Sequence, residues 1–203
     1  ALTRWGRNKS MSWERSHDKP KPLFDLDARP PPRIDGGSFT VILEAVAVAE
    51  DRVVADLAAR IGALTFLGRT ADEVTGLLID TVADWAAGQG WRVYRRARSV
   101  VPLPPPYEHR YSTLDVACAR PAGPPVVVEV DRTDRRRTVD KLLAEAAAGR
   151  IALWVRWGTG GLVAPPAPVR LVTCAVTART GPGGRRYDRV AATDRPPPPH
   201  STA

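Results

Sequence analysis

Two apolar segments that contain acidic residues, the second of them rich in valine, constrain what this chain can fold into. The first covers residues 111–119 and contains Asp115, and the second covers residues 125–131 and contains Glu129. Apolar runs of this length, bounded by proline and glycine, predict largely buried strands. Residues 120–124 predict a hairpin turn between them. A carboxylate inside a buried strand is costly unless something pairs with it, so these strands require a partner for their acids.

The facing of these acids follows from the alternation of side chains along a strand. Glu129 and Asp131 share one face, opposite Val128 and Val130. If Asp115 on the neighbouring strand faces the same way, three carboxylates converge. Such a cluster repels itself unless a cation binds it, and hard oxygen ligands suit Mg²⁺ or Mn²⁺. The alternative is that each acid pairs with a nearby arginine.

Regular elements are predicted on both sides of this pair of strands. Residues 135–149 are rich in helix formers, and Thr133 or Asp134 can serve as the N-cap. Residues 151–157 and 168–177 predict further strands. The acidic strands are therefore followed by a helix and then by another strand.

An amphipathic helix and a half-solvated strand precede the acidic strands. Residues 71–88 carry an apolar stripe at helical spacing, and Thr70 with Glu73 has the pattern of a capping box. That pattern accounts for Glu73 without a catalytic role. Residues 91–97 alternate apolar and basic side chains, as a strand solvated on one face does.

Glycine- and proline-rich segments predict loops or turns at residues 62–68, 101–106, 158–161 and 181–184. The segment 158–161 is glycine-rich, but it lacks the Lys-Ser/Thr pair that completes a phosphate-binding loop. These segments therefore separate elements, and none of them carries a nucleotide-binding motif.

The chain is predicted to hold one domain. Its 203 residues suffice for one domain with a good core, which we place at residues 37–190. Residues 1–36 are predicted to form a flexible, basic, proline-rich arm, and residues 191–203 a disordered tail. Inside the domain, residues 38–61 predict an additional helix, although residues 40–43 could instead form a short strand.

Charge is distributed unevenly along the sequence. The formal net charge is +8, and residues 91–157 carry 13 basic and 7 acidic side chains, whereas residues 37–90 carry 3 and 8. Positive charge therefore surrounds the carboxylate strands, which favours a polyanion such as nucleic acid as the partner. The alternative is that the basic composition serves solubility alone.

The remaining composition indicates a cytoplasmic protein that does not enter a membrane. No apolar run approaches the length of a membrane span. Cys118 and Cys174 both fall in predicted strands and lack metal-ligand spacing, so we expect two buried thiols in a reducing compartment.

The order helix, strand, strand, strand, helix, strand over residues 71–157, with Asp115 and Glu129 at their spacing, resembles the core of the PD-(D/E)XK, or restriction-endonuclease-like, nuclease superfamily. The resemblance implies an α/β fold with an α-β-β-β-α-β core, here with an extra N-terminal helix and a C-terminal strand. It also implies that Asp115 and Glu129 bind a divalent metal, and that a lysine two residues beyond the acid helps to activate water.

The chain departs from this pattern at two positions. Leu114 replaces a proline, which the family tolerates, and Asp131 occupies the position of the lysine. Some superfamily members carry a displaced lysine on the following helix, where Lys141 is the available candidate. Its helical phase predicts an outer face shared with Arg137 and Glu145, so a salt bridge with Glu145 is the alternative.

The resulting hypothesis is a Mg²⁺- or Mn²⁺-dependent endonuclease that hydrolyses phosphodiester bonds in DNA. Its expected catalytic residues are Asp115, Glu129, Asp131 and Lys141, of which the three acids bind the metal. The expected nucleic-acid contacts are Arg95, Arg96, Arg98, Arg132, Arg135, Arg136 and Arg137. Phosphate contacts carry no sequence information, so little base specificity is predicted.

Two other functions fit the same sequence. The first is a catalytically decayed, nuclease-like DNA-binding or adaptor subunit of a larger complex, which the missing lysine favours. The second is a protein-interaction subunit that uses the arm, with Trp5 and Trp13, to bind a protein partner.

Overall fold

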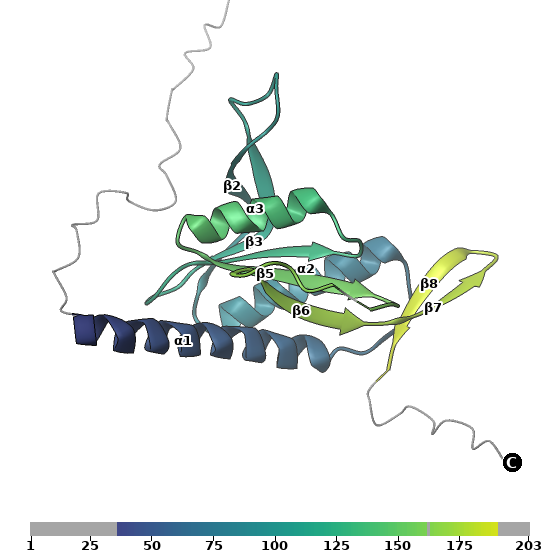
Figure 1. Cartoon of the computed structure of the whole chain (residues 1–203). Helices are drawn as coiled ribbons and strands as arrows, with labels where there is room; N and C mark the ends of the chain where they lie inside the picture. The colour runs from purple at the N-terminus through teal and green to yellow at the C-terminus, as the bar shows by residue number, and fades with distance from the viewer. Residues whose placement is uncertain (1–35, 162, 191–203) are drawn as a thin grey trace, which may run out of the picture.

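The computed structural model describes residues 36–190 with the exception of residue 162. The predicted arm and tail therefore lie outside the described residues, apart from the last residue of the arm. The chain is an α/β protein with three helices and two sheets in this described part (Figure 1). None of the described helices is long and apolar enough to cross a membrane.

A mixed five-stranded sheet forms the centre of the domain, with the strand order β2-β3-β4-β5-β6. Its strands are β2 (Arg92–Pro102), β3 (Tyr111–Ala119), β4 (Val126–Asp131), β5 (Ile151–Gly158) and β6 (Arg170–Ala175). The pairs β2/β3 and β3/β4 are antiparallel, whereas β4/β5 and β5/β6 are parallel. A parallel pair requires a crossover, and the helix α3 (Arg136–Ala147) supplies it between β4 and β5.

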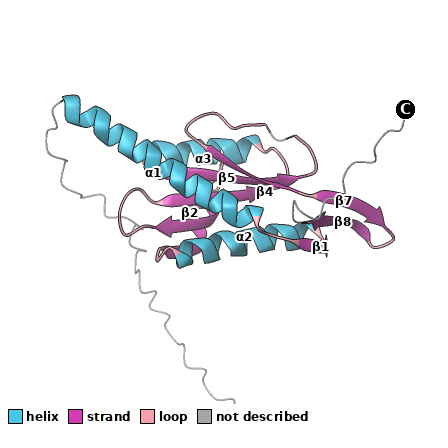
Figure 2. Ribbon diagram, turned by 90° about the horizontal axis from the view of Figure 1, so that it is seen from below, coloured by secondary structure: helices cyan, strands magenta, loops and turns pink. Residues whose placement is uncertain are grey.

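Helices cover both faces of this sheet (Figures 1 and 2). α1 (Gly36–Gly62) and α2 (Ala71–Gly88) pack on one face, where Val128 and Val130 enter the larger core with Leu57 and Leu78. α3 packs on the other face, where Leu142 meets Val127 and Trp154 of the second core. β4 is therefore buried on both sides, which explains why it is entirely valine apart from its two acids.

A small antiparallel sheet extends the domain, with the order β1-β8-β7. It contains β1 (Phe66–Arg69), β7 (Thr177–Gly181) and β8 (Gly184–Arg189). Tyr187 of β8 attaches it to the main core by packing edge-on against Trp157 of β5, with ring centroids 5.0 Å apart.

The structure confirms most of the predicted elements. α2 begins after Thr70, whose side chain accepts a hydrogen bond from Glu73 N while the Glu73 carboxylate accepts one from Thr70 N, so the capping box is confirmed. α1 is continuous, which excludes the alternative strand at residues 40–43. Cys118 and Cys174 are free and buried, as predicted.

Other local predictions were wrong. The N-cap of α3 is Arg135, which makes no side-chain capping bond, and Asp134 pairs with the buried Arg156. The predicted loop at residues 101–106 begins later, since β2 continues to Pro102. The predicted break at residues 62–68 contains most of β1, whose pairing partner, β8, lies more than a hundred residues away.

Candidate active site

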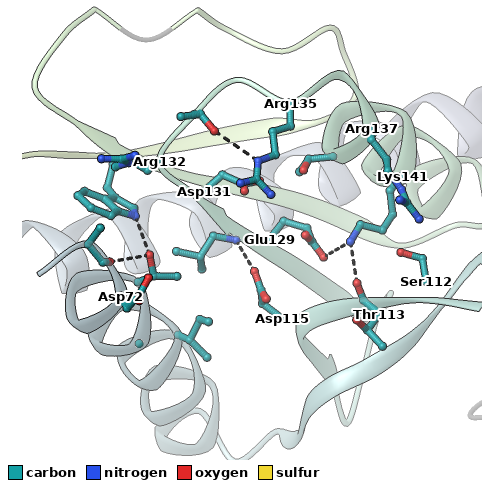
Figure 3. Close-up of a pocket in the computed structure, with 18 residues that line it drawn as sticks. Asp72, Ser112, Thr113, Asp115, Glu129, Asp131, Arg132, Arg135, Arg137 and Lys141 are labelled. Carbon is teal, nitrogen blue, oxygen red and sulfur yellow. Dashed lines mark hydrogen bonds and ion pairs between the residues drawn. The ribbon is translucent and has the colours of Figure 1, made fainter.

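A cavity of about 790 Å³ lies beside the first turns of α2 and α3, where β4 ends (Figure 3). Carboxylates and cations from five elements and loops line it together. The acids are Asp72, Asp115, Glu129 and Asp131, and the cations are Arg132, Arg135, Arg137 and Lys141. All four sequence-predicted catalytic residues therefore border one cavity.

Adjacent strands bring Asp115 and Glu129 together. The paired residues of β3 and β4 end with Val116 opposite Val128, and Asp115 and Glu129 are the next residue of each strand. Both acids line the same cavity. Asp115 Oδ2 also accepts a hydrogen bond of 2.8 Å from Val130 N, which holds the carboxylate against β4.

Lys141 provides the cation for Glu129. Its Nζ lies 2.7 Å from Glu129 Oε1 and donates a hydrogen bond of 2.6 Å to Thr113 O. The Lys141 side chain is only 11% exposed. Glu129 Oε1 is buried, and among the described residues it has this ion pair as its contact but accepts no hydrogen bond of regular geometry. The prediction that Lys141 points outward with Glu145 was wrong.

The burial of Glu145 is the reason that helical phase predicted the wrong orientation for Lys141. The Glu145 side chain is fully buried, accepts hydrogen bonds from Ser99 Oγ at 2.6 Å and Val100 N at 2.8 Å, and forms an ion pair with Arg150. An acidic residue thus occupies a core position on α3. Lys141 flanks that buried side, and its long stem reaches Glu129 from there.

Burial controls the electrostatics of the acids. Burial raises the pKa of Glu129 to about 7, with the charges of Asp115 and Asp131 adding to the effect and Lys141 opposing it. Burial also raises the pKa of Asp115, against the hydrogen bond from Val130 N and the charge of Lys141. The ionised form of both carboxylates is therefore disfavoured in the folded protein, and an added cation would stabilise it.

Asp131 has a different environment from the other two acids. Its Oδ2 accepts a hydrogen bond of 3.2 Å from Trp154 Nε1, and its carbonyl oxygen accepts one of 2.9 Å from Arg156 Nη1. Among the described residues, no three acidic, histidine or cysteine side chains are arranged to hold a metal ion. A metal ligand role for Asp131 stays a prediction.

The two acids of the strand pair nevertheless fit a magnesium site. Mg²⁺ in phosphate-handling proteins is commonly held by one or two carboxylates, with waters and substrate phosphates completing its shell. Asp115 Oδ1 accepts no hydrogen bond from the described part of the chain, and Glu129 lies next to it. Asp115 and Glu129 are the residues that could hold the ion.

The predicted nucleic-acid contacts divide into two groups. Arg132, Arg135 and Arg137 line the cavity. The other four do not line it: Arg95 pairs with Asp80 at 2.5 Å, Arg98 lies over the Tyr111 ring at 3.6 Å, and Arg136 pairs with Asp140 at 3.8 Å. Arg96 is near enough to the cavity for its charge to lower the pKa of Asp115, against the larger effect of burial. The cationic rim of the cavity therefore comes from the β4–α3 connection and the start of α3.

Sequence reasoning missed the contribution of α2 to the cavity. Asp72, Thr75, Gly76 and Ile79 line it, at the i, i+3, i+4, i+7 spacing of one helix face. This stripe, in which Ile79 follows three small or polar residues, lies beside the apolar stripe and was visible in the sequence. The glycine leaves space there, since nothing lies within 4 Å of the position its Cβ would take.

Comparisons of the chain with protein-family models, curated proteins and solved structures find no match.

Proposed function

We propose that this protein is a Mg²⁺-dependent endonuclease that hydrolyses phosphodiester bonds in DNA with little base specificity. The observation that supports the proposal is the cavity in which Asp115 and Glu129, from adjacent strands, meet Lys141 from the next helix. The element order α2-β2-β3-β4-α3-β5 and the change from antiparallel to parallel pairing at β4 support a restriction-endonuclease-like core.

Asp115 and Glu129 would hold the metal, which would lower the pKa of a bound water and neutralise charge on the scissile phosphate. The chain itself positions these acids rigidly. Asp115 is held by Val130 N, and Glu129 is held by Lys141. Preorganisation of this kind is what makes a charged site effective in catalysis.

Lys141 serves as the displaced lysine of the site. Its Nζ contacts both Glu129 and the Thr113 carbonyl, so the positive charge is already positioned at the cavity before a substrate binds. A positive charge fixed there stabilises negative charge as it develops on the phosphate oxygens. Lys141 would thus supply the positive charge that is missing at position 131, where this chain has an aspartate.

Arg132, Arg135 and Arg137 at the rim would bind the phosphates that flank the scissile bond. Guanidinium groups bind phosphate oxygens in pairs of hydrogen bonds and remain charged at all relevant pH values. They cannot act as bases, so we assign them to binding and to charge stabilisation.

The decisive experiment is incubation of the purified protein with plasmid DNA and Mg²⁺, with Asp115→Asn and Glu129→Gln in parallel. We expect cleavage by the wild type, loss of cleavage in both variants, and loss in EDTA. Glu108→Gln, at an exposed position in the β2–β3 loop, is the matched control and should cut as the wild type does. Equal cutting by all variants would remove the proposal.

One observation favours a binding subunit without catalysis as the second candidate. Lys141 already neutralises Glu129 at 2.7 Å, so the acid pair is partly compensated without a metal. This candidate predicts salt-sensitive DNA binding, no cleavage, and a melting temperature that does not change with Mg²⁺. A thermal unfolding titration with Mg²⁺ therefore separates the two functions, because only a ligand that binds the folded state raises the melting temperature.

A further inference from the structure

A second cavity, of about 350 Å³, adjoins the first and differs from it in charge. Arg132 and Thr133 line both cavities, so the two share a wall at the β4–α3 connection. Among the described residues, arginine supplies every charged side chain of the second cavity, at positions 132, 156 and 185. The described lining of the first cavity mixes acids with cations, whereas that of the second has cations alone.

The charges of these arginines are compensated unequally. Arg156 is buried, and its guanidinium pairs with Asp134 at 2.6 Å. Arg132 and Arg185 are exposed and form no ion pair with any acid of the described residues. The uncompensated charge of the cavity therefore comes from Arg132 and Arg185.

These two arginines gather around one tyrosine. Arg132 Nη1 donates a hydrogen bond of 2.5 Å to Tyr187 Oη, and the Arg132 guanidinium lies 5.9 Å from the centre of the Tyr187 ring. The Arg185 guanidinium lies 5.6 Å from the same ring centre. Tyr187 is itself buried against Trp157, so both guanidinium groups lie within 6 Å of a ring that is anchored in the core. Each charge without an acidic partner favours a nearby anion.

The remaining lining suits a phosphate. The turn at residues 158–161 contributes three glycines, and nothing lies within 4 Å of the Cβ positions of Gly160 and Gly161. A ligand can therefore approach the backbone closely there. Thr133 and Thr159 add hydroxyl groups that can donate to phosphate oxygens.

We infer that this second cavity is a subsite for the phosphodiester backbone of the nucleic-acid strand, next to the site of cleavage. The inference rests on the proposed function, and it assigns to the β7–β8 hairpin, seen beside the end of the main sheet in Figure 1, a role in binding substrate. A strand bound at the carboxylates passes Arg132 and reaches Arg185 on the hairpin.

The test is binding of a labelled DNA duplex in EDTA, measured by fluorescence anisotropy as a function of salt. We expect Arg185→Gln to weaken binding several-fold and to reduce the slope of log affinity against log salt by about 1, because one phosphate contact is lost. Arg185→Lys keeps the charge and should retain most of the slope. Arg52→Gln, at an exposed position on α1 that lines neither cavity, is the matched control.

Arg132→Gln tests the other half of the pair, with far-ultraviolet circular dichroism to verify the fold, since this arginine also bonds to Tyr187. Binding by Arg185→Gln that equals the wild type, or a loss equal to that of Arg52→Gln, would overturn the subsite. An unchanged slope would do the same. Equally tight, Arg185-dependent binding of a mononucleotide would also overturn it, because the cavity would then serve a free phosphate compound.

The outcomes separate the subsite from the proposed function. Cleavage that depends on Asp115 but not on Arg185, with unchanged binding, would leave the nuclease and remove the subsite. Weakened binding in Arg185→Gln without cleavage by the wild type would leave the subsite and remove the nuclease.

Discussion

The raised pKa of Glu129 has a direct consequence for stability. A carboxyl group with an ordinary pKa of 4.5 and a folded-state pKa of about 7 binds its proton more tightly in the folded protein. Its contribution is fully present below pH 4.5 and is lost as pH rises through 7, because deprotonation then favours the unfolded chain. The difference between the two pKa values corresponds to about 3 kcal/mol of unfolding free energy.

Glu129→Gln isolates this contribution, since glutamine does not titrate. We expect the free energy of unfolding of Glu129→Gln, minus that of the wild type, to increase by about 3 kcal/mol between pH 4.5 and pH values above 7, and then to level off. The measurement is urea unfolding in EDTA, followed by tryptophan fluorescence.

Other acids do not produce this signal. The Asp115 pKa is raised as well, so its contribution is also lost with rising pH. Asp115 is present in both proteins, so only the part of its pKa shift that depends on the Glu129 charge enters the difference. The pKa values of Glu73 and Asp188 are lowered by backbone hydrogen bonds, so their contributions are lost as pH falls instead. Glu108→Gln should parallel the wild type. If the difference in unfolding free energy between Glu129→Gln and the wild type does not change with pH, burial does not raise the pKa of Glu129.

Three further predictions concern the helices. Lys141→Met should lower the cleavage rate by about 100-fold while the protein remains folded, measured by single-turnover cleavage with circular dichroism as the control; a wild-type rate would deny Lys141 its role. Glu145→Gln should lower the unfolding free energy, measured by urea unfolding, by about 3 kcal/mol, because Arg150 and Ser99 lose their buried anionic partner. The control Asp140→Asn, on the exposed side of α3, should change it by less than about 0.5 kcal/mol. Thr70→Ala should cost about 1 kcal/mol by thermal unfolding, since the α2 capping box is lost, and an unchanged melting temperature would contradict that.

The strand pair shows what local pattern can establish about a site. Valine runs, the proline–glycine turn and side-chain alternation were enough to place Glu129 and Asp131 on one face of β4, opposite Val128 and Val130. These features depend on near neighbours in the chain, so the sequence contains all the information they require. The capping box at Thr70 was predictable for the same reason.

Other features required contacts between distant segments. β1 consists of four residues, and it is a strand because β8 pairs with it. Lys141 was misplaced because helical phase treats a glutamate as a surface residue, whereas Ser99, Val100 and Arg150 compensate Glu145 inside the core. No local sequence pattern shows which distant residues will pair with a buried acid.

The amino-acid sequence by itself determined the two buried acidic strands, the helices around them and the excess of arginine nearby. The tertiary structure decided which partner each cation meets: Glu129 for Lys141, Asp134 for Arg156, and the Tyr187 hydroxyl for Arg132. The physical reason is that the energy of a charge depends on what surrounds it within a few ångströms. Those surroundings come from strands and helices that meet only when the chain has folded.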